Sequence, residues 1–177
     1  FLGKCYTTLT VLNLSSTTIS GEGLESLPVL KLETLNLSSC YSLTNADLLL
    51  LLGKCSTTLK DLILGYTFIS GEGLASVPDL KLERLSLQAC YDLTNIALLQ
   101  FLGKCSATLK DLTLSEATIS GEGLESVPGL KLEKLDLNSC RKLTNTSVLQ
   151  LLGKCSATLA DLGLSGTEFS GEGLESV

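Results

Sequence analysis

The chain repeats itself with a period of 50 residues, and each period consists of two units of different length. A short unit begins at Leu59 with the pattern L-x-x-L-x-L, a long unit begins at Leu82 with the same pattern, and the next short unit begins at Leu109. The two spacings are therefore 23 and 27 residues. A fixed period of this kind indicates a stack of structural units, because each unit buries its apolar face against its neighbours.

Leucine alternates with other residues at the end of each opening pattern, which is typical of a strand. Seven such strands are expected, at 9–14, 32–37, 59–64, 82–87, 109–114, 132–137 and 159–164. In parallel array they would lie roughly 4.8 Å apart and form one sheet. The sequence thus predicts an α/β chain with a single curved parallel sheet of about seven strands, and with helices and turns on the other side.

The segments between the strands differ in the two kinds of unit. In the long unit, residues 96–102 are helical in composition, with Thr94 or Asn95 as the N-terminal cap and Gly103 as the expected stop. In the short unit, two glycines within residues 70–74 weaken a regular helix, so a tight turn or a single 3₁₀ turn is expected there.

The long unit carries the pattern Leu82-x-x-Leu85-x-Leu87-x-x-Cys90-x-x-Leu93-Thr94-Asn95-x-x-Leu98-x-x-x-Leu102-x-x-Cys105. This pattern resembles the cysteine-containing class of leucine-rich repeats, which is known from substrate-recognising subunits of F-box ubiquitin ligases. The short unit has Thr67 in place of the first cysteine and looks like a generic repeat. The alternation of a short and a long unit is also similar to ribonuclease inhibitor, whose units are longer.

The resemblance implies a leucine-rich repeat solenoid, with the sheet on a concave face that binds a protein and the helices on the convex face. Residues 1–177 would form a single array, a fragment of a longer one that lacks both caps. A role in a ubiquitin ligase would rest on analogy alone, because the sequence contains no F-box.

Composition argues against several other functions. The net charge is −6 and no cluster of Lys and Arg exists, so neither nucleic acid nor a membrane surface is an expected partner. The longest run of leucine, 48–52, is far shorter than the roughly 20 residues of a membrane span. There is no His and no C-x-x-C motif, which leaves neither a catalytic base beside the serines nor a metal site. We therefore expect no enzyme activity, no metal and no cofactor.

The seven cysteines form two series, one at 40, 90 and 140 and the other at 5, 55, 105 and 155. Their recurrence at fixed repeat positions predicts buried, reduced thiols and a cytoplasmic location. The N-glycosylation sequons at Asn13 and Asn36 also favour a cytoplasmic location, because glycans at these positions would obstruct the concave face of a secreted protein. The alternative is a Cys40–Cys55 type of disulfide in every period.

The chain contains its own copies, and they differ mainly near the strands. Between 59–108 and 109–158, 17 of 50 positions differ, and 11 of these lie on the strands or just after them. Such positions form a tunable recognition surface, although drift at solvent-facing positions explains the same pattern equally well. The predicted partner-binding residues are Lys60, Asp61, Ile63, Tyr66, Arg84, Ser86, Gln88, Lys110, Asp111, Thr113, Glu116, Lys134, Asp136 and Asn138.

The outward strand positions carry eight acidic and four basic side chains, so the expected partner is a protein with a basic patch. Tyr41, Phe68 and Tyr91, just beyond the strand ends, either extend this surface or cover neighbouring loops. Two other functions remain open: an extracellular receptor ectodomain of the same architecture, and a structural array that associates with itself. Unprotected outer strands also predict an end-to-end homodimer.

Overall fold

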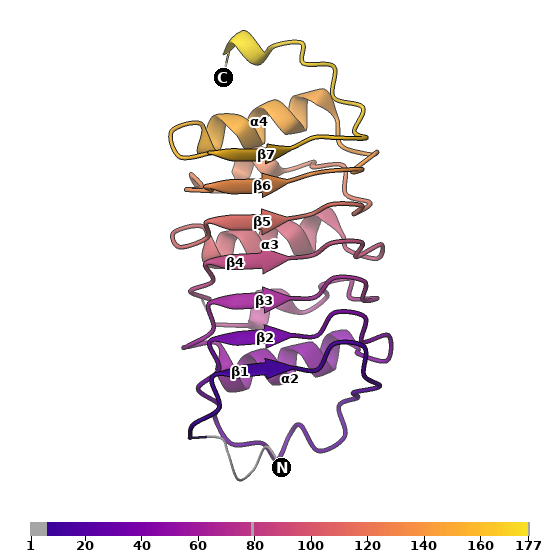
Figure 1. Ribbon diagram of the computed structural model, residues 1–177, viewed down its shortest axis with the longest axis vertical. Helices are drawn as coiled ribbons and strands as arrows, with labels where there is room; N and C mark the ends of the chain where they lie inside the picture. Colours follow the sequence, from indigo (N-terminus) through magenta and orange to yellow (C-terminus); the bar gives the residue numbers. More distant parts are fainter. Residues whose placement is uncertain (1–6, 79, 177) are drawn as a thin grey trace.

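The structure is a computed structural model that describes residues 7–78 and 80–176, and its centre is one sheet of seven parallel strands (Figure 1). Each strand pairs with the next one in the sequence, so the order in the sheet is the order in the chain. The strands are β1 (Val11–Asn13), β2 (Thr34–Asn36), β3 (Asp61–Ile63), β4 (Arg84–Ser86), β5 (Asp111–Thr113), β6 (Lys134–Asp136) and β7 (Asp161–Gly163). The seven predicted strand positions and their parallel arrangement are confirmed.

The regular strands are shorter than the predicted ranges, with three residues each. The central leucine of every strand pairs with the central leucine of the next, as Leu62 does with Leu85. The hydrogen bonds between units continue on both sides of the regular part. The N–H of Arg84 donates to the carbonyl of Lys60, and the N–H of Leu64 donates to that of Ser86. The sheet therefore joins neighbouring units over most of the L-x-x-L-x-L pattern.

Three α-helices, one for each described long unit, lie together on one side of the sheet (Figure 1). They are α2 (Asn45–Cys55), α3 (Asn95–Cys105) and α4 (Asn145–Cys155). Each begins after a threonine whose hydroxyl accepts a backbone N–H, and in α2 Thr44 and Asp47 form a reciprocal capping box. The face of the sheet that no helix covers in Figure 1 is called the open face below.

Gly103 does not end α3 as predicted, because the helix continues to Cys105. The last turn is held from two sides. The Cys105 thiol donates to the carbonyl of Phe101 at 2.9 Å, and the Lys104 ammonium donates to the carbonyl of Val77 in the preceding short unit at 2.6 Å. The first bond lies within the helix and the second is a tertiary contact, and together they outweigh the roughly 1 kcal/mol by which glycine disfavours a helix.

The short units contain only single 3₁₀ turns, η1 (Leu74–Ser76), η2 (Leu124–Ser126) and η3 (Leu174–Ser176), as the glycines predicted. Gly71 and Gly73 adopt φ of 83° and 85°, a region that other residues rarely enter. A Cβ at Gly71 would also collide with the Cβ of Ala97 on α3. The turn can therefore lie against the next helix only because position 71 has no side chain.

One continuous apolar core fills the space between the sheet and the helices. It consists mainly of the repeated leucines, and Leu62, Leu85 and Leu112 are at most 1% exposed. The six described cysteines are free thiols buried in this core, while Cys5 lies outside the described residues. The predicted alternative of a Cys40–Cys55 disulfide is therefore wrong. Burial raises the pKa of the thiols of Cys55 and Cys105 to about 12.

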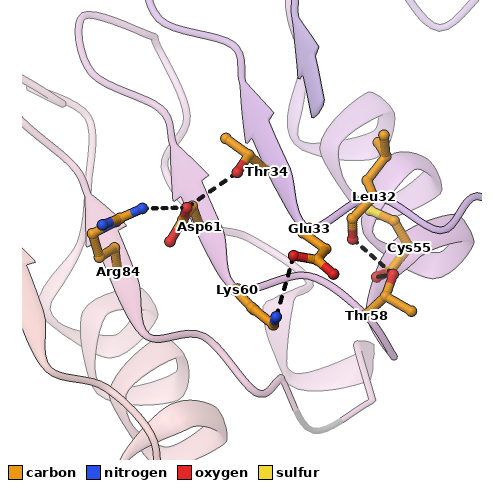
Figure 2. Close-up of polar contacts among 8 residues, drawn as sticks. All are labelled: Leu32, Glu33, Thr34, Cys55, Thr58, Lys60, Asp61 and Arg84. Atoms are coloured by element: carbon orange, nitrogen blue, oxygen red, sulfur yellow. Dashed lines mark hydrogen bonds and ion pairs between the residues drawn. The ribbon is translucent and has the colours of Figure 1, made fainter. Parts of the chain in front are cut away.

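A repeated threonine joins the end of each long unit to its start. The hydroxyl of Thr58 donates to the carbonyl of Leu32 at 2.7 Å (Figure 2), and Thr108 and Thr158 do the same one and two periods later. These bonds satisfy carbonyls just before the strands and tie the last residue of each long unit to its first residue. In the described part of the chain, no helix has the length and apolar character needed to cross a membrane.

Candidate functional site

Two rows of charged side chains cross the strands of the open face. The first row lies just before the strands and contains Glu33, Lys60, Glu83, Lys110 and Glu133. The second row lies on the first residues of the strands and contains Asp61, Arg84, Asp111, Lys134 and Asp161. The sign alternates along each row, and in the four units from β3 to β6 the two positions carry opposite charges, so the charges form a checkerboard. It arises because the short units at β3 and β5 carry Lys-Asp at these two positions, and the long units at β4 and β6 carry Glu-Arg and Glu-Lys.

Neighbouring strands are joined by ion pairs within the rows. Figure 2 shows Lys60 with Glu33 at 3.2 Å and Arg84 with Asp61 at 2.6 Å. Asp61 also accepts a hydrogen bond from the Thr34 hydroxyl at 3.1 Å, and its side chain is only 13% exposed. The hydrogen bond that Arg84 donates to Asp61 raises the pKa of the Arg84 guanidinium above its usual range. These contacts satisfy Asp61 locally.

Asp111 differs from the other acids of the second row. Its two basic neighbours turn away from it: Arg84 pairs with Asp61, and Lys134 pairs with Asp161 at 3.1 Å. Partial burial raises the pKa of Asp111, although the charges of Lys134 and Arg84 act in the opposite direction. Asp111 is therefore a half-buried carboxylate with spare capacity to accept hydrogen bonds from a cation.

The open face is hollowed around these residues. A hollow of about 410 Å³ is lined by the charges of both rows from Glu33 to Lys134. A second hollow, of about 450 Å³, is bounded by Asp61, Arg84 and Asp111 and by the next outward residues along the strands, among them Ile63 and Thr113. Asp111 lines both hollows, so a group that enters either of them meets its carboxylate.

The chain turns sharply just after each strand, and the residue at the turn has left-handed backbone. Tyr66 has a φ of 59° and Glu116 a φ of 63°, although neither is glycine. In this conformation the N–H of Tyr66 donates to the carbonyl of Gln88, and that of Glu116 donates to the carbonyl of Asn138, each at 2.8 Å. These bonds to the next unit offset the roughly 1–2 kcal/mol that left-handed backbone costs a non-glycine residue.

The predicted binding residues fall into three groups. Lys60, Asp61, Arg84, Lys110, Asp111 and Lys134 form the checkerboard, and Ile63, Ser86, Thr113 and Asp136 form a half-buried row beside it. Tyr66, Gln88, Glu116 and Asn138 lie at the turns beyond the strands.

Some of these side chains bond to each other. The amide of Gln88 donates to the Tyr66 hydroxyl at 3.0 Å and to Glu116 at 3.3 Å. Asp136 accepts the N–H of Asn138, and the amide oxygen of Asn138 accepts that of Ser165. The side chains of Asp136 and Asn138 therefore form hydrogen bonds with the backbone of the chain itself.

Sequence reasoning missed two features of the site. The checkerboard was present in the alternating Lys-Asp and Glu-Arg or Glu-Lys pairs, but the separate position of Asp111 depends on which way two long basic side chains turn. The second feature is Asn95, which was expected as a possible helix cap. Instead, its amide donates to the Ser120 hydroxyl at 2.7 Å and accepts the N–H of Ser120 at 3.1 Å, which joins α3 to the next short unit.

Within residues 7–78 and 80–176, no group of three or more His, Cys, Asp or Glu side chains is arranged to hold a metal ion. The predicted binding residues are mainly charged, polar or aromatic, among them Arg84, Ser86 and Tyr66.

Comparisons with known proteins concern the repeat and the fold. A family model described as a leucine-rich repeat matches residues 7–27. No curated protein matches the sequence. A chain in the crystal structure of the Rad7 and Elc1 complex in yeast is similar in fold, with a TM-score of 0.53 and 18% sequence identity. The similarity covers 99% of the present chain and 57% of that chain.

Proposed function

We propose that this chain, which is a leucine-rich repeat protein, is a non-enzymatic recognition module that binds a protein partner on the open face of its sheet. The leucine-rich repeat fold suggests a protein-interaction module in general. The similar chain in yeast occurs in a complex with another protein, Elc1, which agrees with a protein partner here.

The observation that carries the proposal is that Asp111 is partly buried while both neighbouring cations pair with other acidic residues. A half-buried carboxylate without a paired cation is unfavourable in the free chain, because it has lost part of its hydration without a compensating partner. A lysine or arginine from a partner would supply that cation, and the hollows on either side leave room for its side chain. The partner therefore presents a basic patch, and Asp111 receives its central basic residue.

Affinity purification from an extract of the source cells tests this role, with the Asp111→Lys variant beside the original chain. The variant is expected to lose the captured partner, because it places a third cation between Arg84 and Lys134. The matched control is Glu122→Lys, which makes the same change of charge at an exposed turn outside the open face. A partner captured equally well by all three proteins would exclude the open face as its binding site.

With that partner in purified form, the pH dependence of its affinity provides a second check. Binding is expected to weaken as the pH falls through the pKa of Asp111, which burial holds above the usual range of aspartate. The Asp111→Asn variant cannot titrate at this position, so its affinity should change less over the same interval.

We also propose a cytoplasmic location, because the six described cysteines are buried and unpaired. Alkylation of the denatured, unreduced protein should label all seven cysteines of the sequence when the label is counted by mass spectrometry. Five labels or fewer would indicate disulfides and would favour the extracellular alternative.

We also propose an end-to-end homodimer, which the exposure of two leucines in the last short unit supports. Leu162 is 38% exposed and Leu174 is 47% exposed, whereas their counterparts Leu112 and Leu124 are buried by the following units. A second copy stacked on this surface would cover them. Sedimentation over a wide range of concentrations should then show a dimer that Leu162→Glu abolishes, and a strictly monomeric chain at high concentration would exclude the dimer.

A further inference from the structure

A row of exposed aromatic side chains lies at the carboxyl ends of three neighbouring strands, apart from the charged open face. Tyr41, Phe68 and Tyr91 follow β2, β3 and β4 at equivalent positions, and we call them the aromatic ridge. They are 62%, 58% and 51% exposed. The rings of Tyr41 and Phe68 lie 6.0 Å apart between their centroids, at an angle of 47°. The sequence left open whether these rings cover loops, and their exposure favours an available surface.

The ridge is unusual for this chain because aromatic residues are only 5% of the sequence. Tyr66, which is 41% exposed, lies two positions before Phe68, so four exposed aromatic side chains occupy this edge. Scattered apolar side chains are normal on a protein surface, but contiguous apolar patches mark interaction sites. Tyrosine and phenylalanine also supply large contact areas with little loss of conformational entropy.

Basic residues continue the ridge in the C-terminal direction. Arg141 follows β6 at the position that Tyr91 has after β4, and Lys142 is next to it. They are the only two consecutive basic residues in the sequence. Both are exposed and neither forms an ion pair in the described part of the chain. A cavity of about 390 Å³ joins the two regions, because Tyr91, Thr118, Arg141 and Lys142 all line it.

The charged side chains that line the cavity have a net positive charge. Glu116 is the acidic residue in its wall, and it already accepts a hydrogen bond from Gln88 at 3.3 Å. The buried side chain of Ala117 also lines the cavity. In a chain with a net charge of −6, two unpaired cations beside an aromatic row favour a ligand that combines apolar groups with an acidic group.

The internal copies vary most at this edge. Of the 11 differing positions on or after the strands, eight lie beyond the strand ends, at 65–68, 88, 89, 91 and 92. The second copy has Glu116, Thr118, Arg141 and Lys142 where the first has Tyr66, Phe68, Tyr91 and Asp92. The first period thus places mainly aromatic side chains at this edge and the second places mainly charged ones, on frameworks that are otherwise nearly the same. The two sets are neighbours along the stack.

We propose that this edge binds an extended segment of a protein partner, with apolar side chains on the aromatic ridge and a carboxylate at Arg141 and Lys142. Because strands lie roughly 4.8 Å apart, Tyr91 and Arg141 are about 10 Å apart along the stack, which is about three residues of extended chain. The acidic residue therefore stands about three positions from the apolar residue that packs on Tyr91. This site is separate from the open face and does not depend on the binding proposed there.

Other occupants fit the observations less well. An anionic membrane would attract a basic surface, but Glu116 lines the same cavity as the two cations and the net charge of the chain is −6. A second copy of the chain has the same net charge of −6, so its binding at this edge would bring two acidic molecules together.

A library of random peptides displayed on phage provides the probe. Selection on the full chain is expected to enrich peptides with two or more apolar residues and with Asp or Glu about three positions further on. Synthetic copies of these peptides should bind about tenfold more weakly, or worse, to the triple variant Tyr41→Ser, Phe68→Ser, Tyr91→Ser, as expected when aromatic hot spots are lost. All three positions are exposed, so circular dichroism and the denaturation midpoint should remain close to those of the original chain.

The charged part of the site is tested with Arg141→Glu, Lys142→Glu. This variant should bind the peptides about tenfold more weakly, and the dependence of the remaining affinity on salt should be smaller. Lys31→Glu, Lys131→Glu is the matched control, because it makes the same change of charge at two exposed lysines that precede the strands. Val29→Ser is the control for loss of an exposed apolar side chain, because Val29 is 67% exposed and also precedes a strand.

Several results would overturn the proposal. These are a selection that enriches no peptides, enriched peptides without an acidic residue, or equal binding to the ridge variant and to the original chain. Binding of the chain to vesicles of anionic phospholipid that the ridge variant loses would assign the edge to a membrane, and self-association lost in that variant would assign it to a second copy. Asp111→Lys should leave the peptides bound, so this test and the test of the open face fail or succeed separately.

Discussion

Ala117 is the exception at a position that otherwise carries threonine in the short units. The hydroxyls of Thr17, Thr67 and Thr167 donate to the carbonyl three residues earlier, at 2.7–2.8 Å. Ala117 is buried and lacks this donor. Ala117→Thr should therefore raise the free energy of unfolding by about 0.5–1.5 kcal/mol, measured by chemical denaturation.

Ala117→Val is the control for this prediction, because valine has nearly the shape of threonine without the hydroxyl. A lower unfolding midpoint for Ala117→Thr than for the original chain would show that position 117 does not share the register of Thr67.

The buried thiols make the stability of the chain depend on alkaline pH. Burial raises the pKa of Cys55 and Cys105 to about 12 and that of Cys140 to about 11, above the ordinary value of 9.0. In the unfolded chain these thiols lose their protons near pH 9.0, whereas in the folded chain they keep them. Their contribution to stability is thus complete below pH 9.0 and is lost as the pH rises through the folded values.

We therefore expect the midpoint of urea denaturation to fall between pH 9.0 and about pH 12. Lysine and tyrosine also titrate in this interval, so the control is a variant with Cys55→Ala and Cys105→Ala, whose midpoint should fall less steeply. Equal slopes for the two proteins would mean that the thiols are not responsible.

At the scale of the elements, each long-unit helix tolerates a glycine inside its last turn. Gly103 is exposed within α3, and a Cβ at this position would meet no atom within 4 Å. Gly103→Ala should raise the free energy of unfolding by about 0.5–1 kcal/mol, because alanine loses less backbone entropy in a helix. Gly71→Ala is the opposite control, since φ of 83° and the contact with Ala97 predict destabilisation. A destabilised Gly103→Ala variant would imply that α3 ends before this residue.

The bridge between α3 and the following short unit depends on Asn95. Its side chain bonds to the hydroxyl and the N–H of Ser120 and also accepts the N–H of Gly121 at 3.3 Å. Asn95→Ala leaves these groups without their partner, so a loss of about 1–3 kcal/mol is expected in thermal or chemical denaturation. Asn95→Asp keeps the accepting oxygen and should lose less. A variant with alanine that is as stable as the original chain would mean that water replaces the bridge.

At the scale of the whole molecule, stability comes from contacts between neighbouring units. Leu85 is 1% exposed, and its strand pairs with the strands on both sides. Leu85→Ala should lower the free energy of unfolding by about 2–5 kcal/mol. Hydrogen exchange should show that protection falls in several adjacent units and not in one unit alone. Leu174→Ala, at a leucine that is 47% exposed, should have a much smaller effect, and an unchanged midpoint for Leu85→Ala would place this residue outside the core.

The sequence alone was sufficient for the repeat, the parallel sheet, the helices and 3₁₀ turns, and the buried cysteines. The physical reason is that these features depend on short patterns that recur in every unit, such as the inward leucines of 59–64 and the glycines of 71 and 73. A stack of identical neighbours turns such local patterns directly into tertiary contacts.

Tertiary structure decided the features that depend on how neighbouring units meet. The helix α3 continues past Gly103 because Lys104 reaches the preceding unit, and Asn95 bonds to the following unit instead of capping its own helix. Asp111 lacks a cation because Arg84 and Lys134 turn toward other strands. The sequence supplies these side chains, but the partner that each one contacts is decided only when side chains from several units pack together.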